Sequence, residues 1–221
     1  MKKYGLLIVM IASAFLFQNC STVKVMDSWK SDELGQIKDN NFLVVARTDN
    51  KQGRIAFENE IVRQMSAKGY TATASFTKFP NMNPDQKPSE EKQKMIRQIL
   101  ENEGYDGVVL TVLKDYDEET RVDKSGGYYA GGFYGNYYPA YYGGFYGYYY
   151  HPYAYSTMGA YVPETTTVST NKIYTVETVI YDLTRAAEDQ LVVVVTSKIE
   201  NPSNATSTAS EYVEKVSKAL Q

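Results

Sequence analysis

The chain has 221 residues, of which 23 are Lys or Arg, 26 are Asp or Glu, and one each is His and Cys. This length suits one ordinary domain with additions, and the net charge of −3 argues against a basic nucleic-acid-binding surface. A single Cys excludes an intramolecular disulfide and Cys-based zinc sites, and a single His excludes a metal site built from several histidines. Tyrosine is the outlier, with 21 residues against 8 Phe and 1 Trp.

The first 19 residues have the pattern of a secretory signal. Lys2 and Lys3 form a positive start, and the stretch from Tyr4 to Phe17 carries no charge. That stretch is shorter than the ~20 residues that a helix needs to span a hydrocarbon core. We therefore expect residues 1–19 to be a signal peptide that is not part of the fold.

Cys20 follows this region directly, and its position resembles the lipidated cysteine of a bacterial lipoprotein signal. The resemblance implies that the thiol accepts a diacylglyceryl group, that the chain is cut before Cys20, and that the new amine is acylated. Several acyl chains together hold a protein on a bilayer. The alternative is a signal cut elsewhere, or a short uncleaved anchor. Ser21 and Thr22 resemble the sorting signal for the outer membrane, facing the periplasm.

Residues 20–41 are polar, with mixed charge and no clear period, so they are predicted to be a tether and lead-in. Trp29 is the exception and is expected to dock on the domain. The α/β domain is expected over residues 42–220.

Apolar runs and periodicity give the elements of this domain. Phe57, Ile61 and Met65 recur at helical spacing, whereas residues 108–113 are apolar on both faces, as in the interior of a sheet. Strands are predicted at 42–46, 70–75, 108–113, 173–183 and 191–199, and helices at 54–68, from Ser89 to just before Gly104, and at 207–220.

Alternating strands and helices at the front of the domain predict parallel strands with right-handed crossovers, and the later strand pair predicts an antiparallel hairpin. The expected fold class is α/β (α+β): a single domain with a mixed five-stranded sheet and three helices.

A Tyr/Gly-rich insert spans residues 125–163, which contain no Asp, Glu, Lys or Arg. We expect it to be an excursion from the fold that need not join the core, at the tip of a hairpin made by the neighbouring strands. Tyr offers contact area with few torsions. The candidate partner-binding residues are Tyr128, Tyr129, Tyr137, Tyr138, Tyr141, Tyr142, Tyr148, Tyr149 and Tyr150.

Three interpretations of this insert stay open. It is a low-complexity loop without a specific partner, an adhesive surface for a protein or the membrane interface, where Tyr is enriched, or a platform whose rings stack on glycan or peptidoglycan.

No catalytic or metal-binding pattern emerges. His151 lies within the insert, and the carboxylates of Asp115, Asp117, Glu118, Glu119 and Asp123 lack the spacing of an EF-hand. No phosphate-binding loop, zincin or nucleophile-elbow motif is present. We expect no cofactor and no metal, and an envelope hydrolase is the least favoured function.

The turn Glu103-Gly104-Tyr105-Asp106-Gly107 before Val108, the closing segment from Tyr174 to Leu220 and Cys20 together resemble a family of uncharacterised, Bacteroidetes-type envelope lipoproteins with a domain similar to the TolB amino-terminal fold. The resemblance implies a non-enzymatic binding or assembly module in the periplasm, anchored to membrane lipid through acylated Cys20. Its partners would be envelope proteins, with no nucleic acid. The alternative is a lipoprotein that binds glycan or peptidoglycan through the Tyr-rich insert.

Overall fold

The computed structural model describes residues 21–80, 89–121, 128–130, 144–145, 149, 160–162 and 169–221. Its elements in chain order are β1 (Val23–Lys30), the 3-10 helix η1 (Asp32–Ile37), β2 (Asn41–Arg47), α2 (Lys51–Ala67), β3 (Thr71–Ala74), α3 (Ser75–Lys78), α4 (Glu90–Asn102), β4 (Gly107–Arg121), β5 (Tyr128–Ala130), β6 (Ala160–Val162), β7 (Ser169–Asp182), the 3-10 helix η4 (Ala187–Asp189), β8 (Leu191–Glu200) and α7 (Ala205–Ala219).

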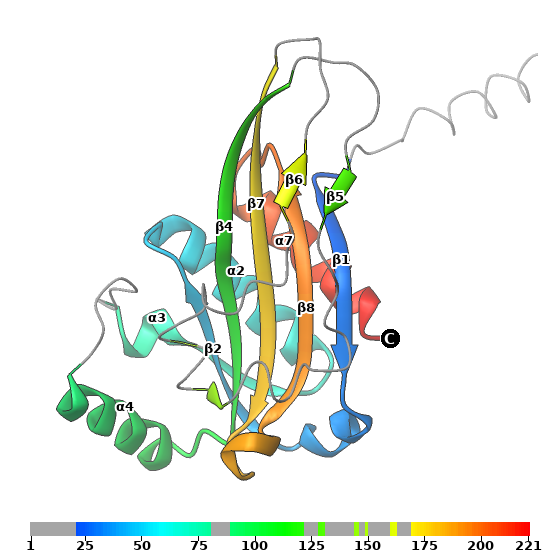
Figure 1. Cartoon of the computed structure of the whole chain (residues 1–221). Coiled ribbons are helices and arrows are strands. Elements are labelled where there is room, and N and C mark those ends of the chain that lie inside the picture. The colour runs from blue at the N-terminus through cyan, green and yellow to red at the C-terminus, as the bar shows by residue number, and fades with distance from the viewer. Residues whose placement is uncertain are drawn as a thin grey trace, which may run out of the picture.

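One open mixed sheet organises the domain, with the strand order β1-β8-β7-β4-β2-β3 (Figure 1). Strand β2 is parallel to both β3 and β4, and β4, β7, β8 and β1 follow one another in antiparallel pairs. The mixed α/β class is confirmed, and the five predicted strands and three predicted helices are present. The prediction of a five-stranded sheet is wrong, because the sheet has six strands, and α3, η1 and η4 were not predicted.

The additional strand is β1, which lies within the segment predicted to be a tether. It pairs with β8 from Val23↔Ile199 to Lys30↔Val193, and Val23 is buried. A register shift between Val25 and Asp27 interrupts the pairing, so the two-residue alternation that marks a strand is broken in the sequence. Residues 23–37 are therefore part of the domain and not a tether.

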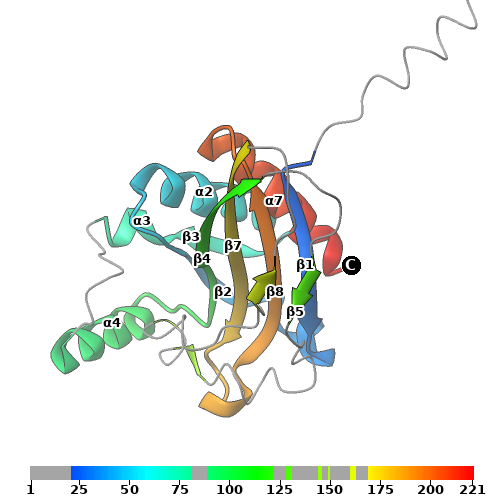
Figure 2. The same ribbon diagram turned by 45° about the horizontal axis from the view of Figure 1, so that its top comes forward.

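Helices α2 and α7 cover one face of the sheet (Figures 1 and 2). Their apolar sides pack on strand residues such as Val44, Val109 and Val195. At the centre, the buried Tyr212 hydroxyl lies 2.9 Å from Thr178 Oγ1, which lies 2.7 Å from Thr111 Oγ1. This hydroxyl chain satisfies polar atoms in an otherwise apolar layer and fixes α7 on the sheet.

The opposite face carries a second core cluster, to which part of the Tyr-rich insert contributes. Leu100 of α4 packs there, and so does Phe145 of the insert, whose exposed fraction is 5%. The Phe145 ring centroid lies 5.9 Å from those of Tyr181 and Tyr149. The short antiparallel pair β5–β6 lies on the same side of the sheet (Figures 1 and 2). The insert was expected to be an excursion that need not join the core; in the structure Phe145 is part of the second core cluster, and Tyr149 is partly buried against it.

Strands β4 and β7 form a hairpin that extends past the rest of the sheet. Their pairing runs to Arg121↔Ser169, whereas the pairing of β7 with β8 ends at Ile173↔Glu200. The predicted continuation of the strands towards the insert is therefore confirmed for the segment that follows Lys114; residues 165–168, the other predicted continuation, lie outside the described residues.

Candidate functional site

The described structure begins at Ser21, the residue after the predicted lipidation site Cys20, which lies outside the described residues. Ser21 Oγ donates to Glu211 Oε1 at 2.6 Å, Thr22 Oγ1 donates to Glu211 Oε2 at 2.7 Å, and Val23 N donates to Glu211 Oε1 at 3.2 Å. On its other side, the Thr22 carbonyl accepts from Glu200 N at 2.8 Å. We call the three bonds to the Glu211 carboxylate the Glu211 clamp; they join the start of the domain to α7.

The electrostatics of the clamp favour a charged carboxylate. Partial burial alone would raise the pKa of Glu211, but the hydrogen bonds from Ser21, Thr22 and the Val23 backbone outweigh burial and hold the pKa below its ordinary value. The acceptor is therefore ionised near neutral pH, which strengthens each bond. The next residue of α7, Tyr212, is buried against the sheet, so the carboxylate is held by a helix that is itself fixed.

The clamp and the base of the Tyr-rich insert lie at the same end of the sheet. Strand β1 is antiparallel to β8, and β8 is antiparallel to β7, so β1 and β7 start at one end. Strand β4 ends there too, because it is antiparallel to β7. Figure 1 shows these three strand ends at the top, with α4 and η4 at the bottom. We call the top the anchor end and the bottom the distal end.

The structure separates the candidate tyrosines. Tyr128 and Tyr129 lie in β5, opposite Val162 and Tyr161 of β6. Tyr149 is partly buried against the second core cluster, and burial raises its pKa, so this ring supports the fold and is not a free contact. The other candidates, Tyr137, Tyr138, Tyr141, Tyr142, Tyr148 and Tyr150, lie outside the described residues.

Sequence reasoning missed a second aromatic feature, formed by Tyr116 and Tyr174 on the β4–β7 hairpin. Their ring centroids are 4.8 Å apart, and Tyr116 is 43% exposed. The Tyr116 hydroxyl donates to the Glu118 carboxylate, and this bond raises the pKa of Tyr116 to about 12. Tyr116 lies in the predicted extension after Lys114 and Tyr174 in the predicted strand at 173–183, and the structure places them at opposed positions in the ladder.

These two rings line an open cleft of about 570 Å³ at the anchor end. The other walls include β2 and α2 and α7 near their first turns, with Arg47, Asn50 and Asn204, and strands β4, β7 and β8 of the sheet. Asn50 and Asn204 cap their helices, since their side chains accept from Gly53 N at 3.0 Å and Ser207 N at 2.9 Å. The cleft therefore combines aromatic faces with polar groups that are already engaged in capping.

The described carboxylates that follow Lys114 are not grouped to hold a metal ion. Asp115, Asp117 and Glu118 are exposed, and Glu118 pairs with Lys172 at 3.8 Å. Among the described residues, no group of three or more His, Cys, Asp or Glu side chains is placed to hold a metal ion. Asp123 and His151 lie outside the described residues. Lys114 itself turns inward, 3.4 Å from Glu177, and burial lowers the pKa of its amine although Glu177 opposes this.

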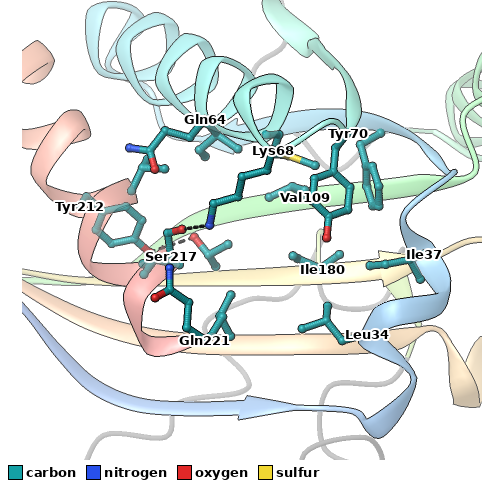
Figure 3. Close-up of a pocket in the computed structure, with 17 residues that line it drawn as sticks. Leu34, Ile37, Gln64, Lys68, Tyr70, Val109, Ile180, Tyr212, Ser217 and Gln221 are labelled. Carbon is teal, nitrogen blue, oxygen red and sulfur yellow. Dashed lines mark hydrogen bonds between the residues drawn. The ribbon is translucent and has the colours of Figure 1, made fainter.

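A smaller cavity of about 200 Å³ lies between α2, α7 and the sheet (Figure 3). Its walls are mainly apolar, with Ile37, Val109 and Ile180 among them, and Lys68 donates to the Ser217 hydroxyl at its edge. The described residues that line it include no His, Cys, Asp or Glu, and the titratable side chains among them are Lys68, Tyr70 and Tyr212.

Within the described part of the chain, no helix has both the length and the apolar character needed to cross a membrane.

Comparisons with known proteins give only distant structural likenesses. No family model matches the chain, and a search of curated proteins found no relative. The chain is similar to a PelC dodecamer from Paraburkholderia phytofirmans, with a TM-score of 0.44, 12% identity, and 90% of this chain and 97% of that one covered. It is also similar to a DUF4136 family protein from Bacteroides thetaiotaomicron, with a TM-score of 0.37, 12% identity, and coverage of 90% and 94%. Likenesses at this level carry no argument about what the chain does.

Proposed function

We propose that the protein is a lipid-anchored lipoprotein of the cell envelope, held at the outer membrane facing the periplasm through acylated Cys20, and that it acts as a non-enzymatic binding or assembly module. The observation that carries the proposal is the Glu211 clamp. It brings Ser21, Thr22 and Val23 into the fold, so a cut before Cys20 leaves every one of these contacts in place. The proposed start of the mature protein lies one residue before the first described contacts of the domain.

Acylation is tested by metabolic labelling with a radioactive fatty acid. The wild type is expected to take up label and Cys20→Ala to take up none, because the thiol is the only one in the chain and acyl transfer needs it. Ser28→Ala, at an exposed position in β1, is the control and should be labelled like the wild type. Equal label on Cys20→Ala would refute the anchor.

The binding role rests on the ring pair of the exposed Tyr116 and the partly buried Tyr174, which line the cleft at the anchor end. Aromatic rings give contact area at low entropic cost, which suits a protein partner. The same rings favour the alternative function, in which they stack on the sugar faces of peptidoglycan.

Site-specific photo-crosslinking in cells distinguishes these functions. A photoreactive residue in place of Tyr116 is expected to capture a defined envelope protein, and one in place of Met95, which is 50% exposed on α4 at the distal end, is expected not to capture it. Equal capture from both positions would contradict a binding surface at the cleft. Retention of the wild type on a peptidoglycan pellet, lost in Tyr116→Ala, would instead favour the glycan-binding alternative.

A further inference from the structure

The distance between the proposed lipid anchor and the folded domain is much shorter than the sequence suggests. A tether over residues 20–41 could extend about 70 Å, at 3.3–3.6 Å per residue, and would leave the orientation of the domain free. In the structure, Ser21 is already hydrogen-bonded to Glu211. Consecutive Cα atoms are about 3.8 Å apart, so Cys20 is one residue away from a fixed point on the domain.

This fixed point is held from two directions. Glu211 of α7 accepts three hydrogen bonds from residues 21–23, and β8 holds the same segment through Glu200 N and the pairing of Val23 with Ile199. The contacts come from elements on two sides of the segment, so it has little freedom to swing.

We propose that the Glu211 clamp holds the anchored domain end-on against the lipid bilayer, with the anchor end at the lipid surface and the distal end turned away from it. The proposal rests on the acylation of Cys20 proposed above. It assigns a partner to one surface: the strand ends around Ser21 and the projecting end of the β4–β7 hairpin face the bilayer. The strands then run away from the membrane, and α4 and η4 lie at the end turned away from it (Figure 1).

The charges at the anchor end are mixed. The hairpin exposes Asp115 and Asp117, whereas Glu118 pairs with Lys172 at 3.8 Å and Glu200 pairs with Lys198 at 3.3 Å. Paired charges reduce the repulsion from lipid phosphates. The Tyr116 and Tyr174 rings near this end have the mixed apolar and hydrogen-bonding character that is enriched at membrane interfaces.

The fluorescence of Trp29 can report the height of this residue above the lipid surface, because Trp29 is the only Trp in the chain. It lies opposite Val194 in the distal part of β1. It comes seven positions after Thr22, and a strand rises about 3.3 Å per residue, which places Trp29 roughly 20 Å from the clamp. In the end-on arrangement Trp29 lies well above the lipid surface. In a domain that rotates freely about its anchor, Trp29 would repeatedly approach that surface.

Energy transfer to a dansyl-headgroup lipid measures this height. The full-length lipoprotein, purified from membranes, is reconstituted in phosphatidylethanolamine–phosphatidylglycerol vesicles. Three proteins with one Trp each are compared: the wild type, Trp29→Phe/Thr170→Trp at the anchor end, and Trp29→Phe/Met95→Trp at the distal end. Transfer is expected to be several-fold stronger from position 170 than from position 95, with Trp29 between them. Equal transfer from all three would overturn the proposal.

Variants of the clamp test its role directly. Ten Gly/Ser residues inserted between Cys20 and Ser21 should abolish the gradient, and Glu211→Ala should reduce it, while Glu214→Ala on the exposed side of α7 should leave it unchanged. A full gradient in Glu211→Ala, with a normal melting curve, would refute the role of the clamp. Flotation with the vesicles separates the two proposals: a protein that does not float refutes acylation and with it the orientation, whereas one that floats without a gradient refutes only the orientation.

Discussion

Replacement of Glu58 by Ala is expected to lower the free energy of unfolding by about 3–5 kcal/mol, because it leaves a buried arginine without its charge partner. Glu58 and Arg54, one turn apart in α2, are 0% and 5% exposed. Glu58 Oε1 accepts from Arg54 Nε at 2.9 Å, from Ala46 N at 3.0 Å and from Ser75 Oγ at 2.8 Å. Its other oxygen accepts from Phe76 N at 2.7 Å. One carboxylate thus joins α2 to β2 and α3.

The measurement is equilibrium unfolding in urea, followed by circular dichroism. Glu214→Ala is the matched control, since it removes a surface pair with Lys218 in which Glu214 is 57% exposed, and such pairs contribute only about 0.3–0.5 kcal/mol. A cost below about 1 kcal/mol for Glu58→Ala would show that the network around Glu58 does not hold α2 on the sheet.

The second large effect is expected at Phe145, inside the Tyr-rich insert. Phe145→Ala should lower the free energy of unfolding by about 3–5 kcal/mol, as for other buried aromatic residues. The ring is 5% exposed, and it packs against Tyr181, which is fully buried in β7. A residue of the insert therefore closes the second core cluster on the face that α2 and α7 leave uncovered.

The same unfolding experiment measures this effect. Met95→Ala serves as the control, because Met95 is 50% exposed and its truncation should change stability by less than about 0.5 kcal/mol. Phe145→Leu should cost less than Phe145→Ala, since it keeps most of the apolar volume. A Phe145→Ala protein as stable as the wild type would restore the interpretation of the insert as an excursion that the fold does not use.

The sequence predicts best where burial dominates. Residues 42–46, 108–113 and 191–195 are apolar runs because they lie inside the sheet, and the structure confirms a strand at each. The edge strand β1 was missed because its bulge breaks the alternation and its outward side chains are polar. The core role of Phe145 was not predicted, because the residues around it are uniformly rich in Tyr and Gly. The available signal was that Phe145, unlike the many tyrosines, has no polar hydroxyl.

The candidate site also has one part that the sequence predicts, Cys20, and one part that it does not, the Glu211 clamp. A pattern of neighbouring residues predicts Cys20 as the lipidation site, because such a signal is a continuous stretch of the sequence. The clamp has no such pattern, since Ser21 and Glu211 are 190 residues apart and Glu211 looks like an ordinary surface residue of a helix. Only the position of α7 beside the start of β1 brings them together.

The central claim is that Cys20 carries the lipid that anchors the mature protein. The most direct test is the intact mass of the protein purified from the membrane fraction. We predict a chain that begins at Cys20 and whose mass exceeds that of residues 20–221 by a diacylglyceryl group and an amide-linked acyl group. A membrane-bound protein that retains residues 1–19, or that begins at Cys20 without added mass, would contradict the account.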